Sequence, residues 1–199
     1  MGDAAPVVSA ARSMLVGAVF DAWDDLDRAL DGLGPAEALL RWEDGTGSSF
    51  AWTLAHVTEL VDSWINVRFQ GLPAHPLIGQ SQFRAGGSGV ADAWPAVLAA
   101  VVAVRAQAAD FLAPLAEESL AQAIPYAGSV RGVREHGRLP LRYALLRIVA
   151  HHYLHIGEIE LKRRQLGRPT DGDFPGQIPA TLNAERPRGS GSGTGAPHV

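Results

Sequence analysis

Three histidines lie within five positions near the C-terminal end of the sequence, in the stretch "AHHYLHIGEIELKRRQLG" from residue 150 to 167. His151 and His155 are four residues apart, so on a helix both side chains project from one face, roughly 6 Å apart along the axis. That spacing allows two imidazoles to bind one metal ion. His152 and His155 form a second pair at a spacing of three, so the spacing alone leaves open which residue is the first ligand.

A third ligand has to come from another helix, and the best candidate is His56 in "SSFAWTLAHVTEL". It lies in the middle of a predicted helix, close to the apolar stripe. Two histidines on one helix and a third on a facing helix can build a metal site in a helical bundle. The alternative is that each is a hydrogen-bonded core histidine, since single buried histidines are common.

The residues around these histidines exclude several kinds of site. The zinc-protease pattern needs a glutamate next to its first histidine, and "HHYLH" has none. Di-metal bundles use Glu-x-x-His, whereas "HVTE" (His56, Glu59) and "HIGE" (His155, Glu158) have the reverse order. The chain has no cysteine, which excludes thiolate zinc sites and a cysteine nucleophile. Thiol chemistry would therefore need a thiol supplied from outside.

The positions of the other polar and aromatic residues in the predicted helices and loops suggest their roles. Arg147 lies one turn before His151 on the same face, so it is a candidate substrate-binding residue for an anionic group, with an exposed arginine as the alternative. The basic stretch "LKRRQLGR" fits the end of a helix, where cations complement the dipole. Trp52 and Trp64 are predicted to be core residues. The remaining histidines are predicted to lie in solvated loops or the tail: His75, His136 and His198.

Four amphipathic segments must position the candidate ligands. They run from about residue 16 to 33, from a cap at Ser48 or Ser49 to Gly71, from a cap at Asp92 to about residue 115, and from about 140 to 166. A long glycine-rich loop separates the second segment from the third, and residues 117–139 read as a loop with a short hairpin. The sequence therefore predicts an all-α, four-helix bundle.

Length and composition indicate one domain. The chain has 199 residues, 47% of them hydrophobic, and a net charge of −4, which gives no support for nucleic-acid binding. The bundle and its C-terminal extension are expected to occupy residues 1–184, with Phe174 and Ile178 packed on the helices. A disordered Gly/Ser-rich tail is expected at 185–199. The longest apolar run, from Trp94 to Val104, is too short to span a bilayer, and the N-terminus lacks signal-peptide features, so a cytoplasmic location without membrane association is expected.

Two stretches resemble specific segments of the DinB-like, damage-inducible family of metal-binding bundles. From about residue 10 to 170, the chain also resembles this family in the order and length of its helices. "SSFAWTLAHVTELVDSWINVRFQGLP" is similar to the family's second helix, where a histidine follows a tryptophan by one turn. "AHHYLHIGEIELKRRQLGRP" is similar to its fourth helix, with an H-x-x-x-H motif and then Gly-Glu. The family register selects His151 rather than His152. Ile156 departs from the arginine that is frequent at this position.

The resemblance implies one divalent ion held by His56, His151 and His155, and often a homodimer. Relatives with assigned roles are mostly enzymes of low-molecular-weight thiols: bacillithiol- or mycothiol-dependent S-transferases, a mycothiol-dependent maleylpyruvate isomerase, and the N-terminal part of ergothioneine-forming sulfoxide synthases. The expected function is thus metal-dependent transfer of such a thiol to an electrophilic small molecule. Zinc is the expected metal, with nickel or iron as alternatives. The alternative function is a non-catalytic metal- or small-ligand-binding bundle of a stress response, and the sequence identifies no general base.

Overall fold

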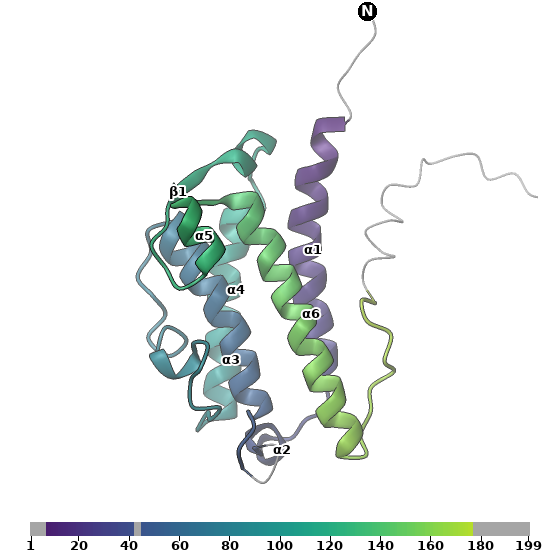
Figure 1. Cartoon of the computed structure of the whole chain (residues 1–199). Helices are drawn as coiled ribbons and strands as arrows, with labels where there is room; N and C mark the ends of the chain where they lie inside the picture. Colours follow the sequence, from purple (N-terminus) through teal and green to yellow (C-terminus); the bar gives the residue numbers. More distant parts are fainter. Residues whose placement is uncertain (1–6, 42–44, 177–199) are drawn as a thin grey trace, which may run out of the picture.

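The computed structural model describes residues 7–41 and 45–176 of the chain. Four long helical stretches lie side by side as a bundle (Figure 1): α1 (Val7–Leu30), α3 (Phe50–Val61) continued by the π-helix η1 (Asp62–Phe69), α4 (Trp94–Leu112) and α6 (Leu141–Gln165). Helix α6 packs against both α1 and α3, and α3 also packs against α4. The predicted all-α, four-helix bundle is confirmed.

The helix starts follow from their capping residues. The side chain of Ser49 accepts a hydrogen bond from the backbone N–H of Trp52 (3.1 Å), so Ser49 rather than Ser48 caps α3. The predicted cap of α4 was wrong by one residue, because extended Ala93 precedes Trp94 and Pro95 occupies the first turn. Proline favours that place, where its missing N–H costs nothing and its fixed φ fits the helix.

Several short elements were not predicted. They are α2 (Pro35–Leu39), the 3-10 helices η2 (Ser81–Phe83) and η3 (Glu117–Ala121), and α5 (Arg131–His136). The predicted short hairpin is confirmed: β1 (Ala123–Pro125) pairs antiparallel with β2 (Arg138–Pro140). Helix α5 forms part of the connection between the two strands, so His136 ends a helix rather than lying in a loop. Only one α5 side chain is buried, that of Val133. The segment therefore lacks the recurring apolar residues from which a helix is predicted.

The helix that carries His56 changes its geometry at Asp62, where η1 begins. A π-helix bonds each residue to the fifth one along and widens the turn. Buried polar side chains stabilise this segment. The amide of Asn66 donates to Asp62 Oδ1 (3.3 Å) and to the Val104 carbonyl of α4 (3.1 Å), while Asp62 Oδ2 accepts from the backbone N–H of His75 (2.8 Å). The wider turns shift which later side chains share a face with His56.

The buried face of α6 separates the three neighbouring histidines. Its core side chains recur at spacings of three and four: Leu141, Leu145, Ile148, His152, Ile156 and Ile159. His152 is 1% exposed, and its Nδ1–H donates to the Ile148 carbonyl of the preceding turn (2.8 Å). His152 is therefore a core residue.

Helix α4 is long and apolar enough, by length and composition alone, to cross a membrane, although the apolar run itself looked too short. Its buried side chains pack within the bundle: Trp94, Val97, Ala100, Val101, Val104, Ala108 and Leu112. Arg105 forms an ion pair with Asp27 of α1 (2.8 Å). These contacts are those of a core helix, although Leu98 and Val102 face outward.

The segment after α6 returns along the bundle. Phe174 packs against the core as predicted, and the guanidinium of Arg28 on α1 lies 4.8 Å from the centre of its ring. Ile178 and the predicted tail at 185–199 lie outside the described residues.

Candidate metal centre

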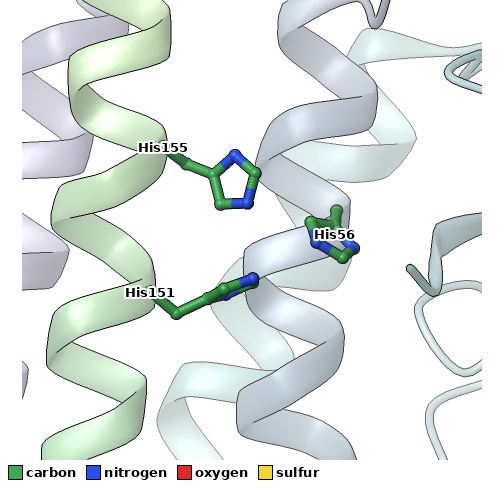
Figure 2. A group of neighbouring side chains, drawn as sticks. All are labelled: His56, His151 and His155. Carbon is green, nitrogen blue, oxygen red and sulfur yellow. The ribbon is translucent and has the colours of Figure 1, made fainter. Parts of the chain in front are cut away.

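The structure brings together the three histidines that the sequence selected. One ring nitrogen from each of His56, His151 and His155 lies within 4.8 Å of the others. Figure 2 shows the two α6 imidazoles pointing across to the imidazole on α3. Ligand nitrogens of one zinc ion lie at most about 4 Å apart, from bonds of about 2.0–2.1 Å. Closing the three rings around an ion therefore needs only small side-chain rotations.

Two contacts fix the ring of His56. Its Nδ1–H donates to the carbonyl of Phe83 (2.6 Å), which can only accept. The ring also stacks on Trp52, one turn earlier, with centroids 4.7 Å apart and planes at 10°. Histidine ligands commonly donate their second N–H to a carbonyl in this way, which leaves Nε2 free for a metal.

The loop that supplies the Phe83 carbonyl is part of the site, which the sequence did not indicate. Trp52 Nε1 donates to the carbonyl of Gln82 (2.7 Å), so one tryptophan holds both the ring of His56 and the loop. A Cβ at Gly87 would lie 1.9 Å from the Gln82 carbonyl oxygen. Only glycine fits such a close approach of two backbone segments.

The half-buried carboxylate of Glu158 fixes the ring of His155. Its Nδ1–H donates to Glu158 Oε2 (2.8 Å), while Glu158 Oε1 accepts from the Ser48 hydroxyl (2.8 Å) and pairs with Lys162. The hydrogen bonds from His155, Lys162 and Ser48 hold the pKa of Glu158 far below its usual range, although burial acts in the opposite direction. Lys162 belongs to the basic stretch that was predicted to end the last helix, and its side chain is only 5% exposed. Ion pairing to Glu158 makes that burial tolerable.

Replacing Glu158 by glutamine is expected to weaken metal binding by about 10–100-fold, the usual cost of losing a partner that orients a ligand. The amide still reaches His155 but lacks the charge that holds the imidazole and balances Lys162. Competition titration against a chelator measures the affinity. Glu135→Gln, at an exposed carboxylate on α5, is the matched control and should leave the affinity unchanged. Equal affinities for both variants would contradict this role of Glu158.

The surroundings of His151 suit a cation rather than a structural histidine. Its Nδ1 is buried and has no hydrogen-bond partner among the described residues, unlike the Nδ1 of core residue His152. Burial, and then the charges of the neighbouring imidazoles and Arg147, lower the pKa of His151 to about 3. Burial also lowers the pKa of His56. Neutral imidazoles are the form that binds metal, so this donor set fits a divalent ion.

A pocket of about 660 Å³ opens beside the histidines and includes His56 and His151 in its wall. Arg147 lies in the same wall, as its predicted place beside His151 requires. Trp64 is buried, as predicted, yet it also lines the pocket. The other lining residues are Glu59, Leu60, Ser63, Arg68, Arg84, Ala85, Tyr126, Gly128, Ser129 and Val130.

Glu59 is the one carboxylate among the described residues that line the pocket. Burial raises its pKa, and Arg84, 3.5 Å away, opposes that rise. In the sequence, Glu59 stands out only as the last residue of "HVTE", one turn after His56. That spacing is the signal that could have identified it, because residues three apart on a helix share a face.

These features define a class: a four-helix bundle in which two facing helices bring three histidines together beside a pocket, with two of the three in its wall. The chain belongs to the DinB superfamily, whose family model matches residues 20–159. The family resemblance of the sequence is thereby confirmed.

The chain is also similar to a solved structure, described as the crystal structure of the conserved protein of locus from Enterococcus faecalis. The TM-score is 0.57, the match covers 76% of this chain and 94% of that one, and 15% of residues are identical. At this identity the likeness shows the fold alone. A comparison with curated proteins gives no significant match.

Proposed function

We propose that the protein is a divalent-metal-dependent enzyme that transfers a low-molecular-weight thiol to an electrophilic small molecule. The observation that carries the proposal is the convergence of three imidazoles, two of which, those of His56 and His151, lie in the wall of a pocket of about 660 Å³. Three protein ligands leave a coordination position for an outside molecule, which is typical of catalytic rather than structural sites. A chain with no cysteine must receive its sulfur nucleophile as a cosubstrate.

A divalent ion at this position, zinc or alternatively nickel or iron, would lower the pKa of a thiol or water molecule beside it. The chain's own residues orient the reactants and move the proton. In this proposal the Glu59 carboxylate, which shares the pocket lining with His56 and His151, accepts the thiol proton. As the sulfur lone pair forms a bond to the electrophilic carbon, the displaced electron pair moves onto the electrophile, which then takes the proton back from Glu59. A carboxyl group whose pKa is raised by burial suits such two-way transfer.

A non-catalytic binding bundle is the alternative, and the pocket lining argues against it. Such a bundle would need no polar side chains around the pocket beyond the imidazoles. Instead, the lining includes Glu59, Ser63 and three arginines. Pockets that hold a small molecule characteristically combine an apolar wall with a few converging polar groups, so this lining favours a site that orients a substrate over one that holds a metal ion alone.

The test uses protein purified without a metal-affinity tag and loaded separately with Zn²⁺, Ni²⁺ or Fe²⁺. Loss of free thiol is measured against a panel of low-molecular-weight thiols and electrophiles, with chelator-treated protein as the control. Glu59→Gln is expected to keep its metal and lose about 10²–10⁴-fold in turnover, the usual contribution of a general base. A fully metal-loaded protein that consumes no thiol would instead support the binding bundle.

A further inference from the structure

Two arginines line the pocket from the two helical stretches that also carry the histidines. Arg147 lies on α6, one turn before His151, and Arg68 lies near the end of η1, the continuation of α3. Arg147 is half-buried and Arg68 is exposed. The pocket therefore has a guanidinium on each of the walls that meet at the candidate metal centre.

Aromatic rings hold both guanidinium groups. The guanidinium carbon of Arg147 lies 5.8 Å from the ring centre of Trp64, and that of Arg68 lies 5.1 Å from the ring centre of Tyr126. The two rings are buried and contact each other edge to face, with centroids 6.0 Å apart. A guanidinium held over a ring by its face keeps its N–H edges free for a planar anion.

The charges of Arg147 and Arg68 have no direct ion-pairing partner among the described residues. Neither Arg147 nor Arg68 forms an ion pair with a carboxylate in the part of the chain that the structure describes, and Arg147 Nε is buried there without a hydrogen-bond partner. The third lining arginine, Arg84, pairs with Glu59 (3.5 Å). Three arginines and one glutamate leave an excess of two positive charges among the charged side chains that line the pocket.

The π-helix η1 determines which side chain of this stretch reaches the pocket. Three α-helical turns from His56, at 3.6 residues each, lead to about residue 67, which is a valine. The wider turns of η1 bring Arg68 to the pocket instead, and Val67 is not among the lining residues. π-Helical segments within α-helices are rare and are frequently found at functional sites. The local backbone geometry thus places the second charge.

We propose that the molecule bound in this pocket is a small organic dicarboxylate, with one carboxylate on Arg147 and one on Arg68. This inference rests on the proposed function and names its substrate class. Guanidinium edges match the two oxygens of a carboxylate, and the pocket supplies two such edges and two uncompensated charges. The part of the substrate between the carboxylates then lies along Trp64 and Tyr126, beside the histidines.

The test measures dicarboxylate binding by chelator-treated protein, so that neither metal coordination nor turnover contributes. The probes are succinate, glutarate and adipate, with butyrate and the diamide of glutaric acid as comparisons, followed by titration calorimetry. At least one dicarboxylate is expected to bind, and more weakly as salt rises. Arg147→Gln and Arg68→Gln should each weaken its binding by about 10–100-fold, as expected for losing a charged hydrogen-bonding partner. Arg147→Lys should fall between these variants and the wild type.

Two matched variants make the test specific. Arg142→Gln changes an exposed arginine of α6 outside the pocket lining and should leave binding unchanged. Arg131→Gln changes an exposed arginine of α5 that pairs with Glu135 outside the pocket lining, and it should have less than about a threefold effect, as for an exposed ion pair. Thermal melting confirms that each variant folds.

Equal binding of the diamide, no dicarboxylate binding, or wild-type affinity in both glutamine variants would overturn the inference. Thiol turnover by the metal-loaded enzyme without dicarboxylate binding would leave the proposed function standing and remove this inference. Dicarboxylate binding without thiol turnover would do the reverse.

Discussion

Alanine at both His151 and His155 is expected to leave the protein without stoichiometric metal. The two residues supply two of the three imidazoles around one point, and His56 alone cannot hold an ion. A single His56→Ala variant should lose about 100-fold or more in affinity, because four-ligand zinc sites bind with about 10–16 kcal/mol in total, or about 3 kcal/mol per ligand. Elemental analysis of protein purified without a metal-affinity tag measures the stoichiometry.

His152→Leu is the matched control for this experiment. His152 is adjacent in sequence to His151, but its ring lies in the core and bonds to its own helix. A leucine of similar size should therefore leave the metal content unchanged. Full metal content in the double alanine variant would refute the assignment, as would metal loss in the His152→Leu protein.

The metal-free protein is expected to lose stability in acid, and His152 should account for a large part of that loss. Burial, and then the charge of Arg105, lower the pKa of His152 from its ordinary 6.5 to about 3 in the folded protein. As the pH falls below about 6.5, the unfolded chain takes up a proton that the folded protein refuses. The free energy of unfolding therefore decreases from about pH 6.5 towards pH 3, and it is unaffected by this group at higher pH.

Urea unfolding of the chelator-treated wild type and His152→Leu at pH 7.0, 5.5 and 4.5 measures the effect. Between pH 6.5 and 4.5, the wild type should lose about 2–3 kcal/mol more than the variant, at 1.36 kcal/mol per pH unit. His151, whose pKa is also lowered, leaves the variant with some acid sensitivity. Identical pH dependence in the two proteins would show that His152 is protonated equally in the folded and unfolded states.

Much of the site was predictable because its central pattern is local. A spacing of four places His151 and His155 on one helix face whatever the rest of the fold does. The choice between His151 and His152 needed more, since both pair with His155 at helical spacings. The family resemblance selected His151, and the structure gives the physical reason: His152 continues the buried stripe of Leu145 and Ile148.

The supporting residues were not predictable, because their roles depend on contacts between distant segments. The carbonyl that orients His56 belongs to Phe83, and any residue at that position has a carbonyl. Lys162 was assigned only to the basic end of the last helix, yet its ammonium group is buried against Ser48, 114 positions away. Sequence patterns show which faces are apolar, but they do not show where a buried charge finds its partner.

The change of helical geometry at Asp62 has a consequence for how such proteins diversify. The three candidate nitrogen donors all lie outside η1, whereas the wider turns of η1 direct Arg68 into the pocket. A relative shorter by one residue there would keep the three donors and turn a different side chain into the cavity. The preference for one small molecule over another can therefore change during evolution while the three histidines of the centre stay the same.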